Sequence, residues 1–500
     1  MTLSADLRSA VLEEDASPEK MREILDAQRA AFLREGPPSA AVRRNRIDRL
    51  WLAVLEHADE IAEALMADFG NRPLATSISS EVLGSLPDVE LVRANFEEWM
   101  RPQPIDGTAE RGMPTFVQNR PKGVVGVMGP WNFPVHLVVA PAVEALAAGN
   151  RVMIKFSEVP ARAAEVFARA VAEQFDADEV TVVRGGPRTS AAFSALPFDH
   201  LFFTGSPAVG RHVGAAAGAN LVPTTLELGG KNPVVVADDS DIAVAAERIA
   251  ATRMMNGGQV CLCPDWVFVP RTKIDDFVEH YQASIRRYFP TILENPDLVT
   301  IVNDANFARV AGLISDAREK GATVISIAPD DESASLPDAA TRRIAPTVVL
   351  GVTEDMRIAN EEVFGPVISI HPYDSLEQPI EAINAKPAPL AAYWYGEDSA
   401  DFREFIRRTT SGGLTRNDMA LHFGIEGAPF GGVGHSGLGA YHGKFGFDAM
   451  SHQRTITGSE LPVGVATQSM PPFGPDALAQ VQAKVAAALQ TTRDRLAASK

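Results

Sequence analysis

The chain has 500 residues, of which 46% are hydrophobic and 22% charged, an ordinary balance for a globular protein of two or three domains. Its formal net charge of −18 argues against nucleic acid and anionic membranes as partners, because both attract basic surfaces. Residues 1–14 lack a signal-peptide pattern, and the longest apolar run, 135–148, is too short and too polar to span a bilayer. With two cysteines, too few to crosslink a large fold, we expect a cytoplasmic protein.

The first hundred residues carry helical patterns. A serine–proline pair at 17–18 is typical of a helix N-terminus. A second predicted helix runs over 39–70, and a third covers roughly 79–100. The following segment, 104–122, is polar, with scattered glycine and proline and one β-like run at 115–118. We expect it to form an extended arm.

Strands and helices alternate after this arm. The first alternation has predicted strands at 124–128, 152–155, 179–184 and 200–203 and predicted helices at 134–148, 161–174 and 208–217. The second has predicted strands at 234–236, 266–269, 324–327 and 347–350 and predicted helices at 241–255, 274–288 and 307–320. Such alternation indicates α/β domains with parallel sheets, which bind ligands at the carboxyl ends of their strands. A last, charged helix is predicted at 475–500.

Two glycine-rich turns follow or begin strands of the first alternation. The turn at 123–129 departs from the G-x-G-x-x-G spacing of dinucleotide-binding proteins. The turn at 205–210, Gly-Ser-Pro-Ala-Val-Gly, follows a strand and would set a helix N-terminus over a pyrophosphate. A plain strand-to-helix turn explains each of them equally well.

Residues 256–261, Asn-Gly-Gly-Gln-Val-Cys, carry the cysteine of greatest interest, and their glycines would let the backbone approach a ligand. Cys261 is either a nucleophile or a buried spectator; as a nucleophile it needs a base and an oxyanion donor. Glu227, before a glycine turn, and Asn132, between a strand and a helix, are candidates. A solvated glutamate, a capping asparagine and a structural cysteine remain open alternatives. Cys261 and Cys263 lack further ligands at metal-site spacing, so no metal is expected.

Five motifs occur in order along the chain: 130–134 (Pro-Trp-Asn-Phe-Pro), 227–233 (Glu-Leu-Gly-Gly-Lys-Asn-Pro), 256–261, 361–366 (Glu-Glu-Val-Phe-Gly-Pro) and 429–437 (Pro-Phe-Gly-Gly-Val-Gly-His-Ser-Gly). Together they resemble the aldehyde dehydrogenase superfamily. Residues 429–452 are similar to its class 3 branch. Within that branch, 69–72 (Phe-Gly-Asn-Arg), 288–290 and 293–297 look closest to the coniferyl aldehyde dehydrogenases.

The resemblance implies NAD(P)-dependent oxidation of an aldehyde, aromatic such as coniferaldehyde, to the acid. Cys261 would form a thiohemiacetal and then a thioester, Asn132 and the Cys261 N–H would hold the oxyanion, and Glu227 would activate water. A fatty or medium-chain aldehyde is the alternative substrate. A CoA-acylating enzyme is a further alternative, although the presence of Glu227 favours hydrolysis. Four aromatic residues are candidates for the lining of a substrate tunnel, with a core position as the alternative for each: Trp266, Phe423, Tyr393 and Trp394.

The resemblance also implies a set of cofactor contacts and favours NAD, with NADP possible. The contacts are Trp131, Lys155, Ser157, Glu158, Gly205, Ser206, Gly210, Leu228, Glu362 and Phe364. Phe156 stands where the family usually has proline. This difference puts the contacts to the adenosine end of the cofactor, and with them the NAD or NADP preference, in question. Glu158 favours NAD because its charge repels a 2′-phosphate. His435 stands where Asn or Pro is commoner, and we expect its ring to be solvated.

The implied architecture is discontinuous. A Rossmann-like cofactor domain takes 1–104, 121–228 and 420–447, and an α/β catalytic domain takes 229–419. A small oligomerisation arm comprises 105–120 and 448–465, followed by a helical tail over 466–500. Since an arm that leaves its own domain needs a partner surface, we expect a homodimer that acts on a small-molecule aldehyde.

Overall fold

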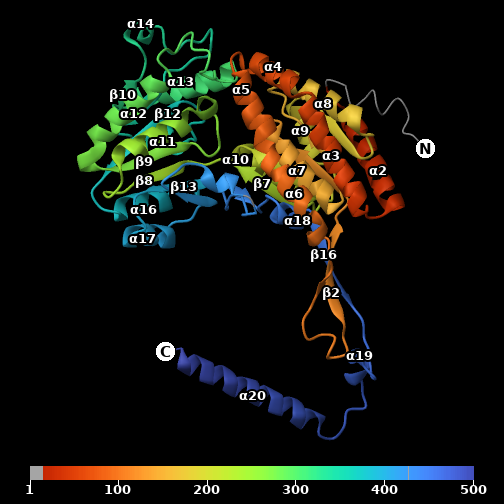
Figure 1. The fold of residues 1–500 in the computed structure, drawn as a ribbon. Coiled ribbons are helices and arrows are strands. Elements are labelled where there is room, and N and C mark those ends of the chain that lie inside the picture. Colours follow the sequence, from red (N-terminus) through yellow and green to blue (C-terminus); the bar gives the residue numbers. More distant parts are fainter. Residues whose placement is uncertain (1–14, 426, 500) are drawn as a thin grey trace. The chain divides into compact units, whose positions relative to one another are not determined.

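The computed structural model describes residues 15–425 and 427–499, so the prediction for residues 1–14 lies outside the described part. The chain divides into two compact units (Figure 1). The first holds Asn119–Gln453 and the chain up to Arg101; the second holds Pro102–Gln118 and the chain from Arg454 on. The domain boundaries expected from the sequence stay a prediction.

The N-terminal helices are confirmed, with two corrections. Helix α2 (Pro18–Glu35) begins as predicted, with the Ser17 side chain accepting from the backbone N–H of Lys20 at 3.2 Å. The helix expected over 39–70 is two helices, α3 (Ala40–Glu56) and α4 (Ala58–Phe69), because His57 leaves the helical conformation at φ −110° and ψ 15°.

The third predicted helix is also segmented. It comprises α5 (Leu74–Ser77), a π-helical turn η1 (Ile78–Val82), a 3₁₀ turn η2 (Leu83–Ser85) and α6 (Leu86–Trp99). A proline in the first turn of α6 cannot donate a backbone hydrogen bond to the preceding turn, which separates α6 from the helix before it. A π turn presents its side chains differently from an α-helix, and η1 carries Glu81.

The first sheet has six strands in the order β15-β7-β6-β3-β4-β5. Its strands are β3 (Val124–Met128), β4 (Arg151–Lys155), β5 (Val180–Val183), β6 (His200–Gly205), β7 (Thr224–Leu228) and β15 (Gly437–Leu438). All neighbours are parallel except β15, which runs antiparallel to β7. The connecting helices are α7 (His136–Ala148), α8 (Ala161–Gln174), α9 (Pro187–Ser194) and α10 (Pro207–Ala219). The predicted parallel α/β sheet is confirmed, while β7 and α9 were not predicted.

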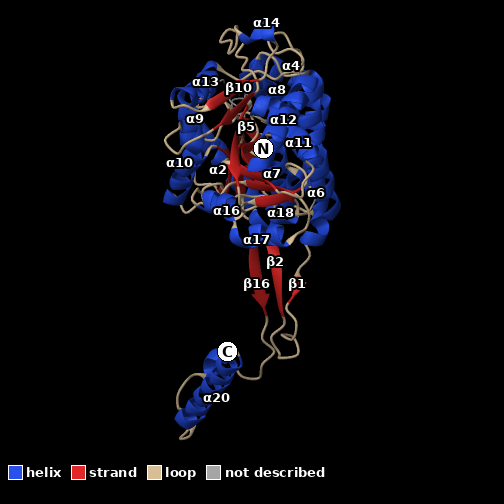
Figure 2. Ribbon diagram, turned by 90° about the vertical axis from the view of Figure 1, so that its left-hand side faces the viewer, coloured by secondary structure: helices blue, strands red, loops and turns tan. Residues whose placement is uncertain are grey.

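The second sheet has seven strands in the order β10-β11-β12-β9-β8-β13-β14, and only β10 is antiparallel to its neighbour. The strands are β8 (Asn232–Val236), β9 (Pro264–Pro270), β10 (Thr323–Ser326), β11 (Thr347–Leu350), β12 (Val367–Tyr373), β13 (Ala391–Tyr395) and β14 (Gly413–Arg416). Its helices include α11 (Ile242–Met254), α12 (Ile274–Tyr288), α13 (Asp304–Glu319), α15 (Arg357–Asn360), α16 (Glu377–Asn384) and α17 (Ala400–Arg408). In the first compact unit, the strands of the two large sheets lie between layers of helices (Figure 2).

One buried hydrophobic cluster includes both Val127 of β3 and Val234 of β8. The two sheets therefore share a core within the first unit. This shared core holds the ends of the two sets of strands in a fixed relation, which a site between them requires.

The second unit contains most of a three-stranded sheet, β1 (Gln103–Pro104), β2 (Thr115–Pro121) and β16 (Ser451–Thr457). The β-like run predicted at 115–118 is the start of β2. Two helices follow β16: the short α19 (Val465–Gln468) and α20 (Ala477–Ala498), which matches the predicted C-terminal helix. Among the described residues, no helix has the length and apolar character to cross a membrane.

Candidate active site

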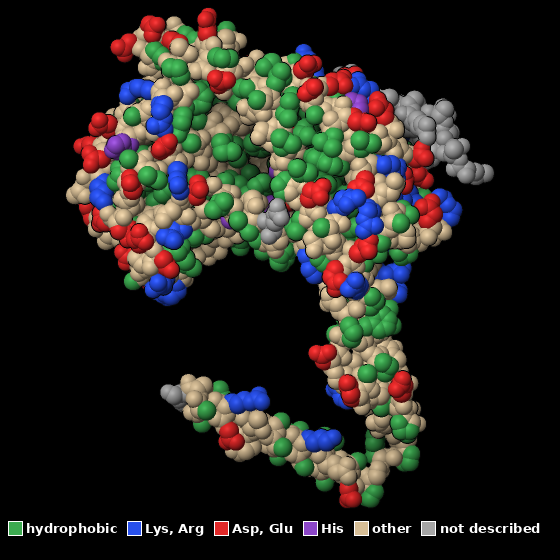
Figure 3. All heavy atoms as spheres, viewed as in Figure 1, with side chains coloured by type: hydrophobic (Ala, Val, Ile, Leu, Met, Phe, Trp, Pro, Cys, Tyr) green, Lys and Arg blue, Asp and Glu red, His purple; other side chains and the backbone are tan. Residues whose placement is uncertain are grey.

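A cavity of about 1270 Å³ opens beside the carboxyl ends of β3, β4, β6 and β7. Residues from the first sheet and from loops and helices around the second sheet line it, and hydrophobic side chains gather around a hollow in the face shown in Figure 3. Of the thirteen residues predicted for the site, twelve line this cavity: Trp131, Asn132, Lys155, Ser157, Glu158, Gly205, Ser206, Glu227, Leu228, Cys261, Glu362 and Phe364. The exception is Gly210.

The loop before Cys261 is a 3₁₀ turn, η3 (Met255–Gly258), with positive φ values of 49° at Asn256, 65° at Gly257 and 80° at Gly258. A Cβ at Gly258 would lie 2.3 Å from the backbone oxygen of Gly365. The glycines therefore allow close approach to another protein loop. The expectation that they admit a ligand is wrong, since neither glycine lines the cavity.

The two cysteines differ in burial. Cys261 is half-buried at the cavity, whereas Cys263 is buried with its Sγ donating to the backbone oxygen of Thr252 at 3.2 Å. Burial raises the pKa of the Cys261 thiol, and the carboxyl groups of Glu362 and Glu227 raise it further. The thiol is therefore protonated at neutral pH in this structure and requires a proton acceptor before it can attack.

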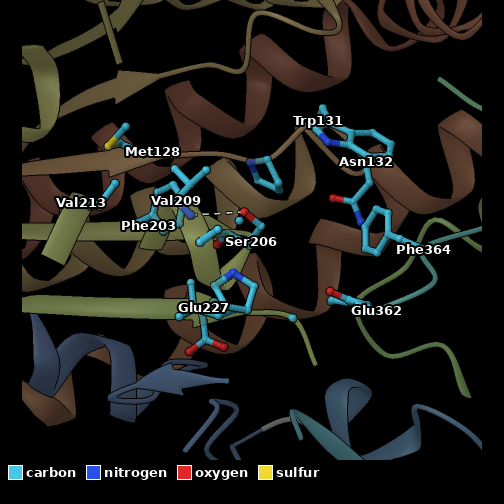
Figure 4. Close-up of a pocket in the computed structure, with 18 of the residues that line it drawn as sticks. Met128, Trp131, Asn132, Phe203, Ser206, Val209, Val213, Glu227, Glu362 and Phe364 are labelled. Carbon is cyan, nitrogen blue, oxygen red and sulfur yellow. Dashed lines mark hydrogen bonds between the residues drawn. The ribbon is translucent and has the colours of Figure 1, made fainter. Parts of the chain in front are cut away.

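Asn132 lies in the loop between β3 and α7 and is buried. Its Nδ2 donates to the backbone oxygen of Gln259, two residues before Cys261, at 3.0 Å. Since an amide nitrogen has two hydrogens, one remains to point at a reacting oxygen beside the thiol. Figure 4 shows Asn132 with Phe364 and Glu362 on one side of the pocket and Ser206, Val209 and Val213 on the other.

Glu227 lies near the end of β7, opposite Gly437 of β15. Its side chain is buried at the cavity, and neither carboxyl oxygen has a hydrogen-bond partner among the described residues. Burial raises the pKa of this carboxyl well above its usual value. An unpartnered buried acid at a cavity is an unusual feature in a native protein, because burial of such a group costs stability, and it is typical of functional sites.

Lys155 ends β4 and its Nζ donates to the backbone oxygens of Phe156 and Gly185, both at 2.7 Å. Burial lowers its pKa to about 8. Phe156 is a buried residue of the cavity wall, and its ring lies 5.3 Å from that of Phe167 in the core. Glu158 is exposed at the cavity edge.

Ser206 caps α10, since its side chain accepts from the backbone N–H of Val209 at 3.3 Å. Gly210, one turn into α10, is absent from the cavity wall. A Cβ there would lie 2.5 Å from Leu228 Cδ2, so Gly210 sets the close packing of α10 on β7. It acts on the cavity only through the position of this helix.

Glu362 and Phe364 belong to the loop between α15 and β12. Phe364 has a strained φ of 45°, and its ring lies 5.2 Å from that of Trp131. Burial raises the pKa of Glu362 to about 8, and the close approach of its carboxyl to Gly229 leaves no room for a Cβ. Arg309 of α13, which sequence reasoning missed, holds this loop by donating to the backbone oxygen of Glu362 at 3.0 Å.

Of the four candidate tunnel aromatics, only Phe423 lines the cavity. Trp266, Tyr393 and Trp394 are core residues; the Tyr393 hydroxyl, for example, donates to the backbone oxygen of Leu262 at 2.7 Å. Further lining aromatics that were not predicted include Phe430 and Tyr441. They lie in the glycine-rich C-terminal motif and the segment after it, where the sequence carries no signal for the direction of their rings.

His435 is not simply solvated. It is half-buried at the cavity, and its Nδ1 lies 3.0 Å from Nη2 of Arg211. Burial and the Arg211 charge lower the pKa of His435, so the neutral ring accepts a hydrogen bond from the guanidinium. No group of three or more potential metal-ligating side chains occurs among the described residues.

Comparison with known proteins places the fold and its cavity in the oxidoreductase class. The chain belongs to the aldehyde dehydrogenase family, which it matches over residues 11–456. It is 44% identical over 450 residues to a probable coniferyl aldehyde dehydrogenase of Caulobacter vibrioides, a match that covers 89% of this chain and 92% of the relative. It is 40% identical over 457 residues to the coniferyl aldehyde dehydrogenase of a Pseudomonas species, covering 91% and 94%.

Among solved structures, Staphylococcus aureus AldH in a substrate-bound state superposes with a TM-score of 0.85 at 32% identity. The match covers 93% of this chain and 99% of that one. The protein is thus an aldehyde dehydrogenase, an enzyme that oxidises aldehydes, and the resemblance inferred from its five motifs is confirmed.

Proposed function

We propose that the protein oxidises an aromatic aldehyde of the coniferaldehyde type to the carboxylic acid with NAD. The observation that carries this proposal is the shared cavity, in which Cys261, Glu227 and Asn132 meet the aromatic side chains of Phe423 and Tyr441. Relatives named coniferyl aldehyde dehydrogenases support the substrate class.

The proposed mechanism rests on three residues. Ionised Glu227 takes the proton of the Cys261 thiol and passes it to solvent, the Cys261 sulfur attacks the aldehyde carbon, and the Asn132 amide and the Cys261 backbone N–H stabilise the oxyanion of the thiohemiacetal. Loss of hydride from that carbon leaves a thioester on Cys261. Glu227, ionised, then takes a proton from water as the water attacks the thioester, which releases the acid and the thiolate. When bound, the oxidised nicotinamide accepts the hydride.

The residues present suit such a cofactor. The N-terminus of α10, capped by Ser206, provides a backbone environment that favours a pyrophosphate. Near Cys261, the acidic groups Glu227 and Glu362 both have raised pKa values, which means that their ionised forms are unfavourable. A positively charged nicotinamide ring beside them would stabilise those ionised forms, so its binding there is favourable. Lys155 and Glu158 would hold the ribose, and the Glu158 charge favours NAD over NADP. The solved relatives include both an NAD-dependent aldehyde dehydrogenase from Sinorhizobium meliloti and an NADP-dependent enzyme from Escherichia coli.

A long-chain aldehyde is the second candidate substrate, and one specific observation favours it. A relative 34% identical over 450 residues is a 4,4'-diaponeurosporen-aldehyde dehydrogenase of Staphylococcus aureus, named for a long unsaturated aldehyde. A panel of coniferaldehyde, benzaldehyde, octanal and a long alkanal, compared by kcat/KM with NAD and with NADP, tests the proposal. We expect coniferaldehyde with NAD to give the highest value; an alkanal preference of tenfold or more would refute the aromatic assignment.

The same assay separates hydrolysis from transfer to another acceptor. We expect carboxylic acid to form at full rate without added CoA or phosphate, because Glu227 lies at the cavity. A strict requirement for either acceptor would refute a hydrolytic role for Glu227.

The protein is also proposed to be a cytoplasmic homodimer. In support, α20 exposes an apolar stripe of Leu478, Val481, Val485, Leu489 and Leu496, which recur at helical spacing on one side. Such a stripe is stable in water when another apolar surface covers it. Light scattering of the full chain and of a chain ending at residue 458 tests this: a monomeric full chain would refute the dimer.

A further inference from the structure

We infer that Arg72 is a positioning residue that holds the oxyanion donor Asn132 and the Cys261 loop in one closed circuit of hydrogen bonds. The inference rests on the proposed role of Asn132. It also explains the segment 69–72, Phe-Gly-Asn-Arg, which the proposed chemistry does not use.

The Arg72 side chain is fully buried between α4 and α5, where it makes an ion pair of 2.8 Å with the equally buried Glu81 of η1. Its Nη1 donates to the backbone oxygen of Asn132 at 3.0 Å. On its other side, Glu81 Oε2 accepts from the backbone N–H groups of Val135 and His136 at 3.0 and 3.1 Å. The pair thus holds the loop both at Asn132 itself and at its junction with α7.

The circuit continues across the cavity wall. Asn132 Nδ2 donates to the Gln259 backbone oxygen at 3.0 Å, and Gln259 Nε2 donates to the Thr300 backbone oxygen at 3.1 Å. The backbone N–H of Thr300 donates to the Asn71 oxygen at 3.0 Å, and Asn71 is bonded covalently to Arg72. Four hydrogen bonds and one peptide bond therefore close a ring that joins the first sheet's loop to the loop of the nucleophile.

Asn71 reinforces the ring. Its Nδ2 donates to the backbone oxygen of Leu298 at 2.7 Å, and Thr300 Oγ1 donates to the Phe69 oxygen at 2.5 Å. Each polar group of the ring thereby has a fixed direction. One hydrogen of the Asn132 amide is committed to Gln259, and the other must point elsewhere. Because a displacement near 1 Å costs up to about 10²-fold in rate, fixing this direction has a large catalytic effect.

The buried charge of Glu81 decides which substitution of Arg72 is informative. Removing the Arg72 side chain would leave Glu81 buried and unpaired, which endangers the fold. Arg72→Lys keeps the positive charge for Glu81, but a shorter point charge cannot also reach the Asn132 oxygen with the geometry of a guanidinium. Thr300→Val tests a support of the ring rather than one of its links, because the ring uses only the backbone groups of Thr300. The variant removes the Oγ1 bond to the Phe69 oxygen, which still accepts from Arg342 Nη2 at 2.7 Å.

The experiment is a double-mutant cycle read by the rate of the NADH burst in stopped flow. Arg72→Lys is expected to slow the burst about tenfold and Asn132→Ala about 10²–10³-fold. In the Asn132→Ala background the ring is already open, so Arg72→Lys should cost less than about twofold. Thr300→Val should slow the burst less than Arg72→Lys does, and this effect should also disappear in the Asn132→Ala background. It replaces Arg72→Lys in the test if that variant does not fold. The dissociation constant for NAD is expected to stay within about twofold throughout.

Arg43→Lys is the matched control. Arg43 is also a buried arginine that donates to a backbone oxygen, that of Ala147 at 2.8 Å, but it does not line the cavity. It should lower the melting temperature without slowing the burst. If Arg72→Lys slows the burst equally in both backgrounds, or acts only on stability as Arg43→Lys does, the positioning role is refuted. A normal burst in Asn132→Ala alone would instead refute the proposed role of Asn132 itself, and the inference with it.

Discussion

The substitution Glu227→Gln separates the chemistry of Glu227 from its effect on stability. Glutamine has nearly the same shape, and no hydrogen bond is lost because neither carboxyl oxygen has a partner among the described residues. An amide cannot take a proton from water, so hydrolysis of the thioester should slow by about 10²–10⁴-fold, which corresponds to about 3–5 kcal/mol of activation free energy. The NADH burst should remain, with a slower rise, because hydride transfer precedes this step and solvent can take the thiol proton in place of Glu227.

The same variant makes a stability prediction with a definite sign. The folded protein raises the pKa of Glu227 by burial, so the folded state retains a proton that the unfolded chain has already lost. Stability contributed by this group is therefore full below the unfolded pKa, near 4.3, and falls as pH rises toward the folded value. Glutamine does not titrate, so the variant should gain stability over the parent by up to about 1.4 kcal/mol per pH unit in that interval.

Urea unfolding of both proteins between pH 5 and 8, with rapid-quench assays of acid release, measures the two effects. Glu144→Gln is the matched control. Glu144 in α7 is fully buried, and burial raises its pKa despite the backbone N–H groups of His442 and Gly443 that oppose the shift, yet it does not line the cavity. It should show the same pH-dependent gain with normal acid release. A Glu227→Gln enzyme that turns over at the parent rate would refute the assignment of the base.

Three further predictions follow from single positions. Cys261→Ala should abolish acid formation while NAD binding persists, and Cys263→Ser should retain activity. If only Cys263→Ser were inactive, Cys263 and not Cys261 would be the nucleophile. Gly258→Ala should destabilise the protein by at least about 2 kcal/mol in urea, because its φ of 80° and the nearby Gly365 oxygen oppose a Cβ. Glu158→Gln should reduce the kcat/KM preference for NAD over NADP by about tenfold, since one repulsive charge is lost; an unchanged ratio would remove Glu158 from cofactor selection.

The sequence was informative where a residue's place follows from its neighbours in the chain. Asn132 and Glu227 lie next to apolar strands, and parallel strands end at one edge of a sheet, so their meeting at one cavity could be anticipated. The break at His57 and the short strands β13 and β14 could not be anticipated as readily, because they depend on packing against distant elements rather than on local periodicity.

Contacts between distant segments were invisible for a different reason. The polar groups of Arg72, Gln259 and His435 each find their partners far away in the sequence: Asn132, Thr300 and Arg211 respectively. A single sequence contains no signal for such pairs. Burial gives the only hint, since an arginine just after a helix end, as in 69–72, needs a carboxylate or carbonyl partner once it is buried.

The acidic groups around Cys261 connect its position to its reactivity. Burial and the two carboxyl groups raise the pKa of the thiol, and among the causes of its shift only its own backbone N–H acts in the opposite direction. The thiol is therefore protonated at neutral pH, and the neutral thiol is a weak nucleophile. Positive charge in the cavity favours its ionisation, and so does a neighbouring carboxylate that accepts the proton. The same burial that costs folding free energy thus couples nucleophilic attack to the transfer of this proton.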